Sequence, residues 1–419
     1  MQLTKKYKVH PTELQKDMLW ELSNACTYLY NIALSERKDT WKNDKKSISY
    51  TKQQNDLPQI KKENPDINIL YSKTCQMVLR KLDANYKSFF GIHKNGDKKA
   101  RPPKFRSCKY FFTITYNQSG FKVIGNIIKF SHKINNDDLI IDIEQDISNL
   151  KIKQIEIFNE DKKGNGDFFV TITYEPEINV PFVQNNHFQA IDLGITKTIT
   201  AINDKGKFFE INNPRYDLYW DSKIGAVQSR RDHCKKYSKK WHRLNKTIRT
   251  MVSKKNNQIK DWQHKTTKKM LENTKANTII VGKLNVKNMG KSKSRSLNRS
   301  TQNNGYLSRF IEFLTYKAEF IGKQVVKIDE SYTSKTCYVC GKQHDMPLYR
   351  RDMTCDCGNI IDRDRNSAIN IMIRYLSQNA IWTGYEHFAH NLRQTGLLTF
   401  DVSQIHPMND ITTRRNLHA

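Results

Sequence analysis

Hydrophobic and polar positions divide the first part of the chain into a helical stretch and a stretch of short strands. A strand is predicted over Leu3–Val9. A helix should follow Thr12, because Thr12 and Gln15 have the spacing of a capping box. The apolar positions that continue this helix at helical spacing are Leu14, Met18, Leu22, Ala25, Leu29 and Ile32. Together with a second helix over Tyr71–Phe90, they predict a helical module spanning 11–97.

The stretch of short strands begins after a basic segment at 98–109, whose adjacent prolines exclude a regular helix. Short apolar runs separated by turn residues then predict strands over Phe111–Tyr116, Phe121–Val123, Ile127–Phe130, Leu139–Ile141, Ile152–Ile157 and Phe168–Tyr174. Their spacing is typical of a small antiparallel β-barrel. We expect this barrel to comprise 1–10 and 98–181, with a domain boundary at Pro181.

From Phe188 onward the pattern changes to that of a mixed α/β domain. Strands are predicted over Ala190–Leu193, Thr198–Ile202, Lys207–Ile211, Thr278–Val281 and Gln324–Ile328. A basic helical hairpin over Tyr216–Glu272 follows the first three strands, and a helix over Tyr306–Gly322 separates the last two. This is the element order of an RNase H-like fold. The expected fold class is therefore α+β and multidomain, with this α/β domain over 182–336 and 358–380 and a polar tail over 381–419.

Charge changes the picture by indicating the partner. The chain carries a formal net charge of +29 at pH 7, so a polyanion is the expected ligand. Aromatic residues often stand beside basic ones, which suits phosphate contact combined with base stacking. No apolar run is long enough to span a membrane, and the N-terminus lacks the apolar core of a signal peptide. We expect no membrane partner and a cytoplasmic location in a prokaryotic cell.

The cysteines fall into a scattered set and a clustered set. The clustered ones form Cys337-x-x-Cys340 and Cys355-x-Cys357, two pairs separated by 14 residues. This arrangement predicts a structural Zn²⁺ site with four thiolate ligands in a ribbon over 337–357. The second pair is one residue tighter than usual, so His344 or Asp356 could replace one thiolate. A disulfide is the alternative, which a reducing compartment disfavours.

Candidate metal-binding carboxylates lie at the two ends of the α/β domain. Asp192 stands inside an apolar strand, where an acid is costly unless it is paired or metal-bound. Asp362 and Asp364 head a predicted helix immediately after the cysteines. A few carboxylates suffice for two Mg²⁺ ions, which prefer oxygen ligands and retain several waters. The alternatives are a strand-end turn residue for Asp192 and a helix cap for the other two.

These segments, in this order, resemble the TnpB family. The resemblance rests on Asp192-Leu193-Gly194, the strand leading into 284–289 (Leu-Asn-Val-Lys-Asn-Met), Tyr332–Cys337 and Asp362-Arg363-Asp364-x-Asn366. It covers 188–376 specifically and the N-terminal part more loosely, where the barrel and helical module correspond to wedge and recognition domains. It implies a RuvC nuclease domain, a guide RNA derived from a transposon, and cleavage of double-stranded target DNA beside a short flanking motif.

Carried over by position, the resemblance makes Asp192 the first catalytic acid and Asp364 the last, with Asp362 a weaker candidate. The middle acid departs from the pattern, because Gly282-Lys283 stands where the family usually has a glutamate. Glu330 follows the neighbouring predicted strand and could supply the missing ligand, since adjacent strands lie about 4.8 Å apart. We therefore expect Asp192, Glu330 and Asp364 to bind Mg²⁺ and catalyse. An inactive site is the alternative.

Three segments are expected to contact nucleic acid. The start of the second helix should meet the flanking-motif duplex, the segment before the barrel should meet phosphates, and the hairpin should follow the RNA or heteroduplex backbone. The residues are, in these three segments, Ser72, Lys73, Thr74 and Gln76; Lys99, Arg101, Lys104, Arg106 and Lys109; and Arg230, Arg231, Lys235, Lys236, Lys239, Lys240, Arg243, Lys254 and Lys255. A solvated charged surface is the alternative.

Other protein classes remain open at this point. A nuclease-dead, RNA-guided DNA-binding protein, similar to a repressor, would differ only in the activity of the metal site. A zinc-ribbon transcription factor would bind DNA without RNA and would not need Asp192 and Asp364 in this frame. A single-strand transposase with a catalytic tyrosine would need a His-x-His motif, and the sequence has none.

Overall fold

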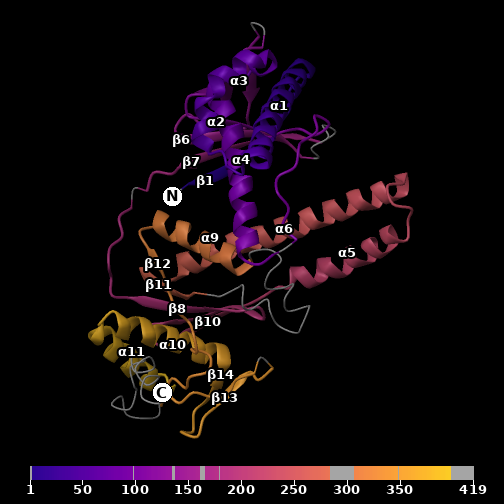
Figure 1. Cartoon of the computed structure of the whole chain (residues 1–419). Coiled ribbons are helices and arrows are strands. Elements are labelled where there is room, and N and C mark those ends of the chain that lie inside the picture. Colours follow the sequence, from indigo (N-terminus) through magenta and orange to yellow (C-terminus); the bar gives the residue numbers. More distant parts are fainter. Residues whose placement is uncertain are drawn as a thin grey trace. The chain divides into compact units, whose positions relative to one another are not determined.

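A computed structural model shows the chain as two compact units, Met1–Glu177 and Ile178–Ala419 (Figure 1). The structure describes residues 2–97, 99–134, 137–160, 166–178, 180–283, 306–347 and 349–397. The motif at 284–289 and the last part of the expected tail lie outside these residues. Within the described part of the chain, no helix is both long and apolar enough to cross a membrane.

The helices of the first unit confirm the expected helical module and add two short helices and a 3₁₀ turn between the two expected helices. They are α1 (Glu13–Asp44), α2 (Tyr50–Asn55), α3 (Leu57–Glu63), the 3₁₀ turn η1 (Pro65–Ile67) and α4 (Ser72–Lys94). The capping box is present, because Thr12 Oγ1 accepts a hydrogen bond from Gln15 N at 3.3 Å and Gln15 Oε1 accepts one from Thr12 N at 2.8 Å. The short helices α2 and α3 fall in a polar stretch, where buried Leu57 and Ile60 are the only apolar anchors of α3.

The strands of the first unit form two antiparallel sheets with a common hydrophobic core. The strands are β1 (Leu3–Val9), β2 (Ile114–Asn117), β3 (Phe121–Ile124), β4 (Ile127–Phe130), β5 (Leu139–Asp142), β6 (Lys151–Asn159) and β7 (Phe168–Glu175). The sheet orders are β1-β7-β6-β2 and β3-β4-β5, so the expected strands are present but their ladders do not close into one barrel. The side chains of Tyr116 and Phe130 link the sheets, with ring centroids 4.9 Å apart.

The second unit is built on a mixed five-stranded sheet of order β10-β9-β8-β11-β12. Its strands are β8 (Phe188–Leu193), β9 (Lys197–Asn203), β10 (Phe208–Asn212), β11 (Thr278–Gly282) and β12 (Gln324–Ile328). The first three strands are antiparallel, whereas β11 pairs in parallel with both β8 and β12. This confirms the expected RNase H-like arrangement. Side chains alternate along β8, so Phe188 and Ala190 belong to one core, and Ile191 and Leu193 belong to another.

Helices cover both faces of this sheet. The remaining elements are α5 (Tyr216–Asp232), α6 (Lys239–Asn273), α9 (Tyr306–Phe320), β13 (Asp352–Thr354), β14 (Ile360–Asp362), α10 (Arg363–Gln378) and α11 (Trp382–Gln394). The face that carries Phe188 and Ala190 packs against α10 and α11, and the opposite face, with Ile191, packs against α9 and the end of α6. Helices α5 and α6 lie side by side and form the expected hairpin (Figure 1).

Helix α11 corrects the expectation of a polar tail beginning at 381. Its Phe388, Ala389 and Leu392 are buried in the same core as the apolar side of α10. Polar residues dominate the composition of this stretch and obscure an apolar stripe at helical spacing, which is what the helix buries.

Candidate acidic site and cysteine cluster

Asp192 lies near the end of β8 and belongs to the sheet face that α10 covers. Phe188 and Ala190, four and two residues earlier, are buried on this face, so strand alternation places Asp192 beside them. Burial raises the pKa of Asp192 to about 8, and the nearby carboxylates of Asp364 and Glu330 contribute to the shift. The structure thus brings the three expected acids into electrostatic contact, although they are 138 and 172 residues apart from Asp192 in sequence.

The Glu330 side chain fills the space that Gly282 leaves open. Strands β11 and β12 pair in parallel with Gly282 opposite Ile328, and Glu330 follows two residues later. A Cβ atom at 282 would lie 2.0 Å from Glu330 Oε2 and 3.0 Å from both Cβ and Cδ of Glu330. A side chain at 282 and the observed position of Glu330 therefore exclude each other. The position that lacks its acid is occupied by an acid from the next strand.

The carboxyl group of Glu330 is held away from water without a hydrogen-bonding partner. Its Oε2 atom is buried and makes no hydrogen bond with any described residue. Burial raises the pKa of Glu330 to about 7, and Asp329 adds to the rise. Asp329 itself is exposed, and its carboxylate accepts hydrogen bonds from Ser331 N at 3.1 Å and Ser331 Oγ at 2.7 Å. Of these two adjacent acids, Glu330 is the one placed in the site.

Asp364 stands in the first turn of α10, and burial raises its pKa, with Asp362 the next cause. Asp362 has a different role, that of a helix cap, which was the alternative expected for this pair. Its Oδ1 caps the helix by accepting hydrogen bonds from Asp364 N at 2.9 Å and Arg365 N at 3.1 Å. Its Oδ2 pairs with Lys197 Nζ at 3.1 Å. Asp362 is thus committed to capping and to an ion pair.

Helix α10 fixes the loop that carries Glu330. Arg374 is buried and donates hydrogen bonds to the carbonyls of Asp329 at 2.5 Å and Ser331 at 2.8 Å, on either side of Glu330. Thr333 Oγ1 donates to the carbonyl of Glu330 at 2.9 Å and lies 3.0 Å from Ser367 Oγ. Ser367 in turn is hydrogen-bonded to the Asp192 carboxylate. A continuous polar chain therefore connects the strand acid to the relocated acid.

Two asparagines one helical turn apart continue this contact. Asn366 Nδ2 donates to the carbonyls of Thr333 at 3.1 Å and Thr336 at 2.8 Å. Asn370 Nδ2 donates to the same two carbonyls at 2.8 and 2.6 Å. Ser367 and Arg374 were not among the site residues expected from the sequence. Arg374 belongs to the spacing 366, 370, 374, which puts polar residues on one side of an otherwise apolar helix, whereas Ser367 lies outside this spacing.

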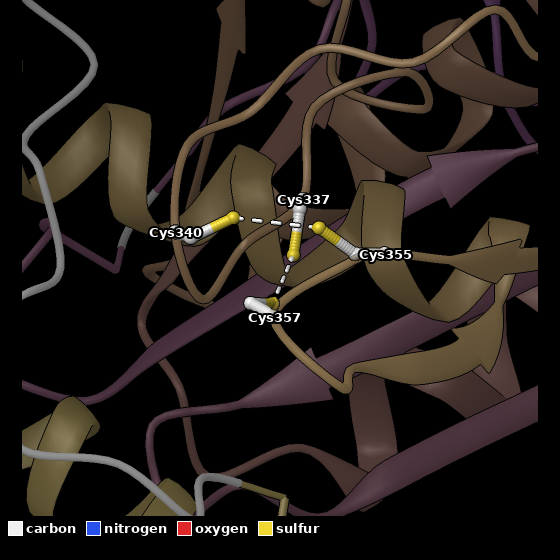
Figure 2. A group of neighbouring side chains, drawn as sticks. All are labelled: Cys337, Cys340, Cys355 and Cys357. Carbon is white, nitrogen blue, oxygen red and sulfur yellow. Dashed lines mark hydrogen bonds between the residues drawn. The ribbon is translucent and has the colours of Figure 1, made fainter.

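The clustered cysteines converge as expected. Their four Sγ atoms all lie within 4.8 Å of one another, and two of the contacts measure 3.7 Å (Cys337–Cys357) and 3.5 Å (Cys340–Cys355) (Figure 2). Tetrahedral coordination with Zn–S bonds of about 2.3 Å requires sulfur atoms roughly 3.8 Å apart. The cluster therefore fits a metal ion and is compatible with a zinc ribbon. Among the described residues, no cluster of three or more Asp, Glu or His side chains is as tightly gathered.

The tighter second cysteine pair needs no substitute ligand. Asp356 points away and forms a surface ion pair with Lys342, with 80% of its side chain exposed. His344 donates a backbone hydrogen bond to the carbonyl of Lys335 at 2.8 Å, and its ring contacts Cys355 from outside the cluster. Asn359 Nδ2 donates to Cys337 Sγ at 3.3 Å, which supports a thiolate there.

The hairpin candidates are mostly exposed, as a nucleic-acid contact requires. Exposed positions include Arg230, Lys235, Lys236, Lys239, Lys240, Arg243 and Lys254. Arg231 is half-buried and lies over the Trp241 ring, 5.9 Å from its centroid. Lys255 was expected to contact nucleic acid, but it is buried and its Nζ pairs with Asp221 Oδ1 at 2.6 Å inside the hairpin. It holds α5 and α6 together and is not available to a strand.

The candidates in the first unit also differ in accessibility. Ser72, Lys73, Lys99, Arg101, Lys104 and Lys109 are exposed, and Gln76 is half-buried. Thr74 is only 1% exposed, so it packs inside the unit and cannot contact a base in this conformation. Arg106 is exposed, yet its guanidinium lies over the rings of Tyr30 and Phe112 at 5.0 and 4.8 Å.

Comparison with known families agrees with this geometry. Residues 308–371 match the model of the Cas12f1-like TNB domain, and 170–293 match the model described as "Probable transposase" of the OrfB_IS605 type. Residues 1–46 match a model described as a helix-turn-helix domain. The described part of that stretch consists of β1, the capping turn and α1. The matched regions together include Asp192, Glu330, Asp364 and the four cysteines.

Whole-chain relatives point in the same direction. A Streptomyces pristinaespiralis protein named "Putative RNA-guided DNA endonuclease" is 24% identical over 90% of both chains. The Escherichia coli K12 protein named "Putative RNA-guided DNA endonuclease InsQ" is 23% identical over 80% of this chain and 82% of its own length. A Cas12f1 chain solved with single-guide RNA and target DNA matches with a TM-score of 0.60 at 14% identity, over 86% of this chain and 83% of that chain. These findings confirm the resemblance to TnpB proteins, and the last one confirms the fold.

The exclusion between Gly282 and Glu330 predicts a non-additive pair of substitutions. Gly282→Ala should lower the free energy of unfolding by about 1–2 kcal/mol, because the new Cβ displaces a packed side chain. In a Glu330→Ala background the same change should cost much less, since the colliding atoms are gone. Chemical denaturation of the four proteins measures this cycle. Gly225→Ala, where a Cβ meets nothing within 4 Å, is the control. Additive losses would contradict the exclusion.

The raised carboxyl pKa values predict how stability depends on pH. Asp192 and Glu330 bind protons more tightly in the folded chain, with pKa values of about 8 and 7, than in the unfolded chain. Without added Mg²⁺, the unfolding free energy should therefore fall as pH rises from 5 to 8. Asp192→Asn should reduce that slope. Asp146→Asn, which removes a carboxyl whose pKa Ser148 lowers, should leave it unchanged in this range. Equal slopes for parent and Asp192→Asn would refute the assignment.

Proposed function

We propose that this TnpB-like protein is an RNA-guided endonuclease that cuts double-stranded DNA beside a flanking motif with a Mg²⁺-dependent RuvC site. The observation that carries the proposal is the Glu330 side chain in the space beside Gly282, in electrostatic contact with Asp192. With Glu330 in this place, the site again contains three acids, although Gly282, at the usual position of the second acid, cannot bind a metal. The Streptomyces pristinaespiralis relative named "Putative RNA-guided DNA endonuclease", which aligns over 90% of both chains, supports the proposal.

Asp192, Glu330 and Asp364 would hold the magnesium ions. Their oxygens are the hard ligands that Mg²⁺ prefers, and the buried, unpartnered Oε2 of Glu330 is an acceptor suited to a cation. When bound, two such ions supply an activated water and charge stabilisation for phosphodiester hydrolysis. Ser367 orients the Asp192 carboxylate, and Arg374 and Thr333 hold the Glu330 loop by its carbonyls. These contacts keep the acids in place before a metal arrives.

The four cysteines would hold a structural Zn²⁺ ion. All four ligand positions of a tetrahedral ion would then be protein thiolates, which leaves none for a substrate or water. The ribbon is tied to α10 through Asn366 and Asn370, so an ordered ribbon also secures the Thr333–Thr336 turn beside Glu330. The role of the metal is thus to hold the carboxyl loop, not to take part in the reaction.

The guide RNA and target DNA would bind the exposed basic residues of both units. A net charge of +29 favours backbone contact without sequence preference, and base pairing with a transposon-derived guide would supply sequence recognition. In the hairpin we assign this role to Arg230, Arg231, Lys235, Lys236, Lys239, Lys240 and Arg243. In the first unit we assign it to Ser72, Lys73, Gln76, Lys99, Arg101, Lys104, Arg106 and Lys109. The unit from 1 to 177 would contain the wedge and recognition domains.

A nuclease-dead, RNA-guided DNA-binding protein is the second candidate function. The specific observation in its favour is Gly282-Lys283, which removes an acid and adds a positive charge at the usual second motif. In this case the charge and the guide would remain useful, and the protein would occupy its target without cutting it.

Cleavage by single-residue variants separates the two functions. Protein purified with RNA from cells that carry its native locus should cut a matched duplex with Mg²⁺. Glu330→Ala, Asp192→Ala and Asp364→Ala should each lower the cleavage rate by about 100-fold or more, because each removes a metal ligand. Asp329→Ala is the matched control and should cut like the parent. Gel-shift affinity should stay constant throughout. A parent that binds without cutting would establish the binder, and a fully active Glu330→Ala would refute the relocation.

Zinc content tests the cysteine cluster. The purified chain should contain about one Zn²⁺ per molecule by elemental analysis. Cys355→Ser should lose the ion and melt at a lower temperature, because the ribbon and the adjacent turn lose their link. Asp356→Ala should retain zinc, since its carboxylate is bonded to Lys342 at the surface. Zinc retained by Cys355→Ser, or iron in its place in the parent, would contradict the assignment.

A further inference from the structure

A cavity of about 350 Å³ opens beside β8 on the sheet face opposite the acidic site. Gln189 lines it and lies on the same face of β8 as Ile191, which packs toward α6 and α9. Asp192 is three residues farther along and faces α10, so about 10 Å of strand and the sheet itself separate the two positions. The cavity is therefore distinct from the proposed metal site.

The floor of the cavity presents a buried polar atom with no partner. Gln189 is only 7% exposed, and its Oε1 accepts no hydrogen bond from the described residues. A buried acceptor that stays unsatisfied costs roughly 1–3 kcal/mol, so such groups in folded proteins usually meet a donor. The geometry calls for a ligand that brings an N–H or O–H group to this point.

The rim of the cavity is positively charged. Lys205, Lys207 and Lys275 line it and are exposed, and none of them forms an ion pair with a residue that the structure describes. The one acid in the lining, Asp204, is bonded through Oδ2 to His187 Nδ1 at 2.9 Å. This contact fixes the imidazole at the cavity edge and leaves the lysines as the available charges. The rim suits a phosphate group.

An aromatic ring completes the lining. Phe209 pairs with Ala201, which pairs on its other side with Ile191, so Phe209 lies on the same sheet face as Ile191. Gln189 and Asn203, which pair with each other, also lie on this face. The Phe209 side chain borders the cavity and is 38% exposed. A flat ligand can stack on an exposed ring of this kind.

We infer that this cavity binds one unpaired nucleotide of a nucleic-acid strand. A phosphate alone does not fit the floor, because Gln189 Oε1 would repel its oxygens. A base brings the donor that Gln189 lacks and a flat face for Phe209, and the attached phosphate reaches the lysine rim. Either a guide RNA or a DNA strand could supply the nucleotide. The site needs neither Mg²⁺ nor cleavage, so it stands apart from the proposed nuclease activity.

Saturation-transfer NMR on the full chain, stripped of nucleic acid, tests this inference. The probes are 5′-mononucleotides, their 2′-deoxy forms and inorganic phosphate. We expect saturation of base protons, with Gln189→Leu and the exposed Phe209→Ala each weakening binding about tenfold, as expected for one base-edge contact or one stacking contact. Gln324→Leu is the control, because this glutamine lies in the same sheet and already donates to Thr278 Oγ1 at 3.1 Å.

The outcomes decide both the inference and the source. If the signal disappears when co-purified guide RNA is bound, the nucleotide belongs to the guide, and if it disappears only with target DNA, it belongs to a DNA strand. Either result supports the inference. Absence of saturation transfer from every nucleotide would overturn it, as would phosphate competing as well as the nucleotides, which marks an adventitious ion only. Parent-like binding by Phe209→Ala, which should fold even if Gln189→Leu does not, would also overturn it.

Discussion

The missing side chain at 282 is the constraint on which the acidic site depends. In a parallel pair of strands, residues that follow one strand lie beside the end of its neighbour, and here the end of β11 is a glycine. Without a Cβ at 282, Glu330 can cross from β12 toward β8 and come within electrostatic reach of Asp192. With alanine or glutamate at 282, the same backbone would force Glu330 outward. The two positions therefore act as one unit, and neither can be understood from its own residue type.

Glu330 reaches past the end of β11 from the loop that follows β12, and this loop must be held if its acid is to stay in place. Helix α10 does this through groups that recur at one helical side: Asn366 and Asn370 on the turn at 333–336, and Arg374 on the carbonyls around Glu330. The same turn leads directly into Cys337, so the cysteine cluster and the carboxyl site share one support. This shared support gives a physical reason for the position of the cysteine cluster between β12 and α10.

Much of this arrangement follows from the sequence by simple rules. The capping box at Thr12, the strand over Leu3–Val9 and the order of elements after Phe188 depend on local patterns, and the structure reproduces them. The relocation of Glu330 was predicted because strand adjacency in a known fold is itself a rule. The polar chain through Ser367 and Arg374 was not, since it depends on which side of α10 faces a loop 30 to 45 residues earlier. Burial of Thr74 and Lys255 likewise needs tertiary contacts, because both residue types usually face solvent.

Gathering three carboxyl groups in one place opposes folding at neutral pH, because burial and the nearby carboxylates of Asp364 and Glu330 raise the pKa of Asp192. The chain offsets the cost with hydrogen bonds that come from neutral or positive groups outside the acids: Ser367 on Asp192, and Arg374 on the loop carbonyls instead of the Glu330 carboxylate. An arginine bonded directly to Glu330 would relieve the repulsion more, yet it would also compete with a metal ion for the same oxygens. Holding the backbone and leaving Oε2 unpartnered keeps the acid positioned and still able to bind a cation. If the site served stability alone, a hydrogen-bond donor to Glu330 Oε2 would be expected.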